Sequence, residues 1–311
     1  MQKLCGLTMN TRMSNWTTGL LLAIGGTFLF ALKSIFIKLA YAEGATPDEV
    51  LLLRMLIAAP FYAGMLIFLR KRGIKHSSCD SWSLIKILSL GFFGYYLASY
   101  LDLAGLSFIS AQLERLTLFT YPTMIAVLAW LFLGEKITRM IILSLVLCYA
   151  GLWVMYGVEK ELMLSENTGN VTRGVVLVLG SALSYSIYVI FAKPLILKFG
   201  SRFFTSVAML GSTVFVCIHF AILHPLSFAH ISGIIWLYAF LLAFVCTVIP
   251  SFMITEAISR IGAARTSILG AAGPVFTIIL AVFVINEPFT LYHALGVGLV
   301  LVGVSCVSLK K

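Results

Sequence analysis

Charged residues are scarce in this sequence. Asp, Glu, Lys and Arg together make up 11% of its 311 residues, whereas a soluble domain carries roughly 25%. Hydrophobic residues make up 60%, so an ordinary soluble domain is excluded and an all-α membrane protein is predicted. A helix needs about 20 apolar residues to cross the hydrocarbon layer, and an open sheet cannot face lipid because its backbone polar groups would be unpaired.

Cysteine and histidine offer no recognisable site. The six cysteines include no C-x-x-C pair, and the five histidines are scattered along the chain. Neither a disulfide framework nor a metal site is therefore predicted. No nucleophile is paired with a base either, so we expect no catalytic residue, no metal and no cofactor, and we do not expect an enzyme.

Acidic residues are outnumbered by basic ones, 12 against 22, which gives a formal net charge of +10. In a soluble chain this excess would suggest nucleic acid, but no basic run alternates with exposed aromatic residues. The positive-inside rule predicts such an excess in the cytoplasmic loops of a membrane protein. Membrane lipid is therefore an expected partner, and nucleic acid is not.

Long apolar runs predict ten transmembrane helices. Tryptophans fall near the ends of several runs, where amphipathic rings prefer the interface. The segment 1–16 is polar and short, and the apolar run after it is far longer than the core of a signal peptide. The expected spans are 17–41, 49–69, 84–106, 111–133, 138–157, 174–195, 203–223, 232–255, 264–285 and 289–309.

The sequence contains an internal repeat. Positions 122 and 274 are both proline, 135 and 287 both glutamate, and 151 and 303 both glycine, and each pair differs by 152 in residue number. A fixed offset in residues of different kinds indicates one unit written twice. We expect a first repeat at 17–157, an extracytoplasmic linker at 158–173 and a second repeat at 174–309.

Five spans in each repeat would place the second copy upside down in the membrane. The predicted fold is therefore ten transmembrane helices arranged as two inverted five-helix repeats, an architecture typical of secondary transporters. Basic residues gather in 70–86, 134–139, 193–202 and at the C-terminus. The positive-inside rule then places both termini in the cytoplasm, in a multi-pass protein of the cytoplasmic (inner) membrane.

Several motifs resemble the EamA family of the drug/metabolite transporter superfamily. They are Ile37-Lys38 followed by Leu53-Arg54, the block SFISAQLERLTLFTYPTMIAVLAWLFLGEKIT, and its second copy ending in VFVINEP. Phe30 stands where many members have tryptophan, and Asn286 where glycine is usual. The resemblance implies a carrier whose central cavity is formed by the first four helices of each half, with the fifth helices, 138–157 and 289–309, peripheral.

Ionisable residues within the spans are candidates for the substrate route, because a charge near the bilayer centre is costly unless it is paired or hydrated. Lys33, Asp102, Glu114 and Arg115 fall at a similar depth in the outer half of the membrane, counted at about 1.5 Å per residue. A pair between Asp102 and Arg115, or between Lys33 and Glu114, would lower that cost. We interpret the four as partners for a zwitterionic substrate; the alternative is an ion pair that only fixes the hairpin.

Tyrosines and prolines supply further candidates. Tyr121, Tyr185 and Tyr188 could form cavity walls with hydroxyl tips, although most such tyrosines serve packing. Pro122 and Pro274 occupy matching points of the two repeats, and paired interruptions of this kind point to a transporter site. They are interpreted as hinges, with ordinary kinks as the alternative.

An inner gate is suggested by charges near the cytoplasmic ends of spans. Glu256 and Arg260 are four residues apart and can pair along a helix. Together with Lys193 and Arg265 they would latch the cytoplasmic side. Interfacial charge that merely follows the positive-inside rule is the alternative.

The resemblance implies the transport of small metabolites such as amino acids or their derivatives, often outward. We therefore expect an exporter of a small-molecule substrate that works by alternating access. Nucleotide sugars or phosphorylated sugars are alternative substrates, since relatives carry them. A membrane-embedded enzyme or a structural subunit is the alternative from another class. Asp102 or Glu114 would carry a coupled proton, and the protein is expected to be a monomer or a homodimer.

Overall fold

The computed structural model describes residues 2–72, 80–166, 170–224, 231–261, 266, 269–270 and 272–308. Within these ranges the regular structure is helical, with no strand. The helices are α1 (Gln2–Ala42), α2 (Pro47–Lys71), α3 (Ser81–Gly91), η1 (Phe92–Leu97), α4 (Ala98–Leu106), α5 (Ala111–Leu118), α6 (Tyr121–Leu133), α7 (Arg139–Glu166), α8 (Val171–Phe199), α9 (Ser201–Leu223), α10 (Gly233–Ala243), η2 (Phe244–Val248), α11 (Ile249–Ile261), α13 (Gly273–Val284) and α14 (Leu291–Ser308), where η denotes a π-helix.

Eight helical segments among the described residues are long and apolar enough to cross a membrane. Their ends agree with the first eight expected spans to within a few residues. At the places of the ninth and tenth expected spans lie two shorter apolar helices, Gly273–Val284 and Leu291–Cys306. Part of the beginning of the expected ninth span, including Arg265, lies outside the described residues.

Two helices extend beyond the expected boundaries. α1 begins at Gln2, so the segment predicted to precede the first span is helical. α7 continues to Glu166 through most of the segment predicted to be a linker. The sequence Val-Glu-Lys-Glu-Leu there contains good helix formers, and the Glu159 side chain is buried and hydrogen-bonded, which favours continued helix over loop. Asn170, interpreted as part of a loop, caps α8 by accepting a hydrogen bond from the Arg173 amide at 3.1 Å.

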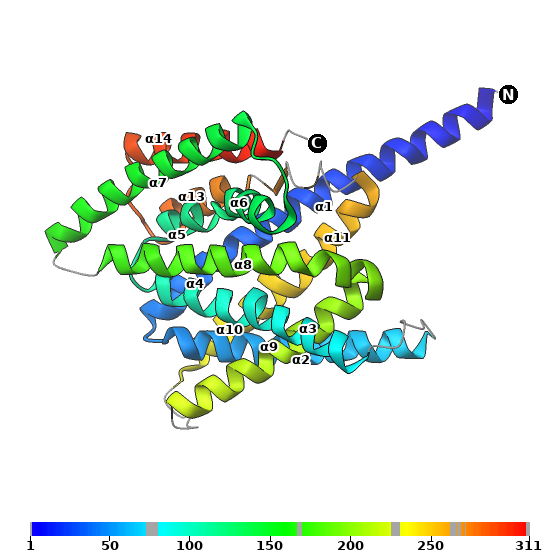
Figure 1. The fold of residues 1–311 in the computed structure, drawn as a ribbon, viewed down its shortest axis with the longest axis horizontal. Helices are drawn as coiled ribbons and strands as arrows, with labels where there is room; N and C mark the ends of the chain where they lie inside the picture. The colour runs from blue at the N-terminus through cyan, green and yellow to red at the C-terminus, as the bar shows by residue number, and fades with distance from the viewer. Residues whose placement is uncertain are drawn as a thin grey trace.

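The helices form a bundle with α8 running through its middle (Figure 1). α7 and α14, the fifth helices of the two halves, lie together along one edge (Figure 1). They approach closely because their contact is made of small residues: a Cβ added to Gly151 would lie 2.6 Å from the Gly296 carbonyl oxygen. The Ser144 hydroxyl also donates to the Gly303 carbonyl at 2.5 Å.

The largest apolar core lies on the other side of the bundle. Buried residues of α1, α2, α4, α9 and α10 form one cluster, which includes Ile37, Leu53, Leu103 and Leu242. The start of α2 is fixed locally by a capping box, in which the Glu49 amide donates to the Thr46 hydroxyl and the Thr46 amide donates to the Glu49 carboxylate. Packing on this side holds α1 and α4 next to each other, which matters for the site described below.

The prolines expected to kink two spans lie where helices begin. α5 ends at Leu118 and α6 begins at Tyr121, with Pro122 in its first turn. Amides in the first turn have no partner within the helix, so the missing amide proton of a proline costs no hydrogen bond there. Pro274 holds the same place in α13. The fourth span is therefore two helices with a break at 119–120 rather than one kinked helix.

The two matched glutamates lie at opposite ends of one span. Glu287 contacts the start of α5, where its carboxylate accepts a hydrogen bond from the Ala111 amide at 2.7 Å. Glu135 follows the end of α6, on the far side of the segment Ala111–Leu133, and is exposed. We call the end of the bundle at Ala111 the α5 end and the opposite end the α6 end.

Candidate functional site

A cavity of about 980 Å³ lies within the bundle, and both halves of the chain line it. Charged residues and aromatic rings share its wall with small polar and apolar side chains. The charged and aromatic lining residues are Phe30, Lys33, Arg54, Tyr62, Tyr95, Asp102, Arg115, Phe119, Tyr121 and Tyr185. This combination of a mostly apolar wall and a few placed polar groups is typical of small-molecule sites.

The cavity extends toward the α6 end of the bundle. Thr205 near the start of α9, and Val304 and Ser305 near the end of α14, line it. α14 therefore contributes to the wall although it lies along the edge of the bundle (Figure 1), where the family resemblance places both fifth helices. At the α5 end the lining on α1, α4 and α5 stops at Lys33, Asp102 and Arg115, so these charges form part of the floor of the cavity.

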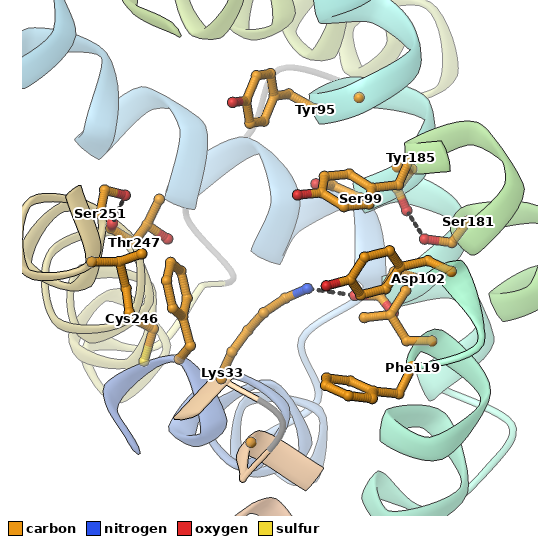
Figure 2. Close-up of a pocket in the computed structure, with 18 of the residues that line it drawn as sticks. Lys33, Tyr95, Ser99, Asp102, Phe119, Ser181, Tyr185, Cys246, Thr247 and Ser251 are labelled. Carbon is orange, nitrogen blue, oxygen red and sulfur yellow. Dashed lines mark hydrogen bonds and ion pairs between the residues drawn. The ribbon is translucent and has the colours of Figure 1, made fainter. Parts of the chain in front are cut away.

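Lys33 and Asp102 form a direct ion pair. The Lys33 Nζ atom of α1 lies 2.5 Å from Asp102 Oδ2 of α4, with the two side chains 18% and 3% exposed. Figure 2 shows the lysine side chain reaching across the cavity to the carboxylate. The structure thus joins two of the sequence-predicted residues, but in a pairing different from the two expected ones.

Glu114 and Arg115 turn toward α1 instead. Ser34 donates its hydroxyl hydrogen bond to Glu114 Oε2 at 2.7 Å. Arg115 Nη2 donates to the Phe30 carbonyl at 3.2 Å and to the Ser34 hydroxyl at 2.9 Å. Glu114 is completely buried and lies behind the lining, whereas Arg115 lines the cavity. The depth of each residue along its helix correctly predicted that these residues lie near one another. The hydrogen-bond and ion-pair partners depend instead on the direction in which each side chain points.

Two of the three candidate tyrosines face the cavity. Tyr121 and Tyr185 line it, with ring centroids 5.4 Å apart and nearly perpendicular planes. Tyr188 packs behind the wall, where its hydroxyl lies 2.9 Å from the hydroxyl of Tyr95. Tyr95 takes the lining place instead. Of the candidate hinges, Pro122 lines the cavity, and Pro274 is buried next to the lining residue Gly273.

Two of the candidate inner-gate residues, Glu256 and Arg260, pair directly. Arg260 Nε lies 2.7 Å from Glu256 Oε1, a pair four residues apart along α11. Lys193 is exposed on α8. The Glu256–Arg260 pair joins two turns of α11 and lies against α1, since a Cβ added to Gly19 would be 3.0 Å from the Arg260 Cβ atom.

Two π-helices were not predicted. η1 begins at Phe92 and η2 at Phe244, residue numbers that again differ by 152. Gly94 and Tyr95 of η1, and Cys246 and Thr247 of η2, line the cavity, and π-turns often occur at functional sites. The repeat offset relates the two segments, but a π-turn has no residue pattern by which the sequence alone would have revealed it. Gly94 is required where it stands, since a Cβ there would overlap the Tyr188 ring.

A pair of carboxylates caps α5, an arrangement that we call the α5 clamp. Glu159 of α7 accepts from the Ser110 amide at 2.6 Å and from the Ser110 hydroxyl at 2.8 Å. Glu287 accepts from the Ala111 amide at 2.7 Å and the Gln112 amide at 3.2 Å. The exposed amides and positive dipole end of a helix favour anions in this position. Burial raises the pKa of Glu287, while the Ala111 amide and the nearby charge of Lys38 act in the opposite direction.

A second contact closes the same end of the bundle. His224 Nε2 at the end of α9 lies 2.7 Å from Asp48 Oδ2 in the first turn of α2. The α5 clamp ties α5 to α7 and to the segment before α14, and this contact ties α9 to α2. The cavity is therefore closed at the α5 end.

Metal-binding groups do not gather anywhere in the described part of the chain: no three or more His, Cys, Asp or Glu side chains there could hold an ion together. The charged groups of the cavity are instead suited to binding a polar solute through hydrogen bonds and charge.

An internal cavity with a charged floor, inside a bundle of membrane-length helices, is typical of a multi-pass membrane transporter. Residues 17–157 and 172–309 each match the sequence model of the EamA-like transporter family. The chain belongs to that family, within the drug/metabolite transporter superfamily.

Relatives agree with this assignment. The "uncharacterized transporter YcbK" of Bacillus subtilis is 31% identical over 293 residues, 90% of this chain and 89% of the relative. The "uncharacterized transporter sll1319" of a Synechocystis strain is 25% identical, with 94% of both chains covered. A crystal structure at 16% identity has a TM-score of 0.63 and covers 94% of this chain and 97% of its own, which supports the fold alone.

Proposed function

We propose that this protein is a secondary carrier that exports small metabolites, such as amino acids or their derivatives, across the cytoplasmic membrane by alternating access. The observation that carries the proposal is the cavity with its Lys33–Asp102 floor, which extends to one end of the bundle and is closed at the other. A carrier needs such a site, accessible from one side at a time.

The proposal includes two inverted repeats of five spans each, 17–157 and 174–309, with both termini in the cytoplasm. Its support is the placement of the matched glutamates at opposite ends of the bundle. In the conformation described here Glu287 is bonded and Glu135 is exposed. We infer that during transport Glu135 becomes bonded at the α6 end while Glu287 is released at the α5 end, because similar halves can adopt each other's conformation.

Purified full-length protein in proteoliposomes tests the proposal. Vesicles loaded with a panel of labelled amino acids and acylated or deaminated derivatives are expected to show saturable efflux of at least one compound. Chemical conversion of the compound would instead support an enzyme, and neither flux nor conversion across the panel would support a structural role. Empty vesicles and vesicles with heat-unfolded protein are the controls.

Proton coupling is proposed to use Asp102 or Glu114. Each has one buried carboxyl oxygen, Asp102 Oδ1 and Glu114 Oε1, and the two carboxyl groups lie close enough to interact with each other. A proton on such an oxygen would remove a buried charge. We expect Glu114→Gln or Asp102→Asn to make flux independent of an imposed pH gradient. Flux in both variants that still follows the gradient as in the unmodified protein would contradict this assignment.

A further inference from the structure

Arg54 is a buried cation that the ion pair described above does not use. It lies on α2, its side chain is 7% exposed, and it lines the cavity. Its Nε atom is buried without a hydrogen-bond partner among the described residues. A buried guanidinium with an unused donor is costly to maintain, so a partner is expected to occupy the space in front of it during function.

The charges around the cavity leave an excess of positive charge. Three cations, Lys33, Arg54 and Arg115, line the wall, and two carboxylates, Asp102 and Glu114, lie at or behind it. Asp102 is taken by Lys33, and the described hydrogen bonds of Arg115 go to the neutral acceptors Phe30 and Ser34. The cavity is therefore matched to an anionic ligand rather than to a cation.

We propose that Arg54 binds the carboxylate of a monoanionic organic acid with an apolar body. This inference rests on the proposed function and names the substrate class of the same cavity. A guanidinium offers two parallel donors that fit a carboxylate. Aromatic side chains, including Phe30, Tyr62 and Tyr95, supply apolar surface for the remainder of the ligand. A free ammonium group would meet the positive excess, so acylated or deaminated amino acids fit better than zwitterions.

Ligand binding to the purified full-length protein in detergent tests this proposal without requiring transport. The probes are 3-phenylpropionate, its amide 3-phenylpropanamide, and phenylalanine, which share one apolar body and differ in charge. We expect the acid to raise the thermal unfolding midpoint and to bind at least about tenfold more tightly than the amide, the ratio typical of a charged hydrogen bond. Phenylalanine is expected to bind more weakly than the acid.

Arg54→Gln is expected to remove the preference for acid over amide. Arg54→Lys, which keeps the charge but not the paired donors, should retain part of it. Arg70→Gln is the matched control, because Arg70 is exposed near the other end of the same helix. The preference is the ratio of two affinities measured in one variant, so a general loss of stability in Arg54→Gln would not by itself remove it. If Arg54→Gln does not fold, the comparison is made with Arg54→Lys.

Three results would overturn the Arg54 proposal: equal binding of acid and amide, an unchanged preference in the Arg54 variants, or no binding of the acid at millimolar concentration. Carboxylate-selective binding without flux of the same acid in proteoliposomes would instead contradict the carrier proposal and leave the Arg54 site in place. Saturable flux of acid and amide alike would contradict the Arg54 proposal and support the carrier proposal.

Discussion

Lys33→Gln is expected to reduce flux at least about tenfold and to destabilise the protein, since breaking a buried ion pair by removing one partner costs about 3–5 kcal/mol. The variant leaves the Asp102 carboxylate, 3% exposed, without its cation. The double variant Lys33→Gln/Asp102→Asn removes both charges. Its thermal unfolding midpoint should return toward that of the unmodified protein, because neutral replacements of a buried pair are often tolerated.

The double variant separates a role in function from a role in folding. If the pair binds substrate or takes part in the transport cycle, flux remains low in the double variant although stability is recovered. If the pair only fixes α1 to α4, flux recovers together with stability. Lys86→Gln, at an exposed lysine of α3, is the control for loss of a positive charge. Unchanged flux in Lys33→Gln at normal expression would refute a functional role for this residue.

Glu287→Ala is expected to open the closed end of the bundle. The carboxylate accepts two amide hydrogen bonds at the start of α5, and loss of such charge-assisted bonds costs about 2–3 kcal/mol. We expect a lower thermal unfolding midpoint. A cysteine placed in the cavity by Ser99→Cys should also react faster with a membrane-impermeant maleimide added at the α5 end, in a background without the native cysteines.

The repeat provides a matched control for this experiment. Glu135 holds the corresponding position of the first half but is exposed, so Glu135→Ala should leave the midpoint and the labelling rate nearly unchanged. An equal effect of the two substitutions would contradict the α5 clamp as the contact that closes this end. An effect of Glu287→Ala on stability without an effect on labelling would assign the α5 clamp to folding alone.

The sequence predicted the helical class and most of the span boundaries because apolar run length is set by the membrane. It also identified Lys33, Asp102 and Arg115, which lie together at the floor of the cavity. It did not predict which charges pair. Rise per residue gives the depth of a side chain, whereas its direction depends on how α1, α4 and α5 pack against one another.

Other features depend on contacts between distant parts of the chain. Glu287 was recognised as a repeat partner of Glu135, but its acceptor role at α5 joins residues 176 positions apart. Tyr188 was predicted to line the cavity, but in the folded bundle it packs behind Tyr95, which lines the cavity instead. Arg54 was noticed only as part of a family motif, since burial without a partner becomes visible only in three dimensions.

The account depends most on two inverted halves that enclose one cavity. Lys136 and Pro288 hold corresponding repeat positions and are both exposed, so single cysteines at these two sites test the inversion directly. In cells, a membrane-impermeant maleimide should label Pro288→Cys from outside, and Lys136→Cys only after the membrane is opened. Labelling of both cysteines from the same side of the membrane would contradict the account.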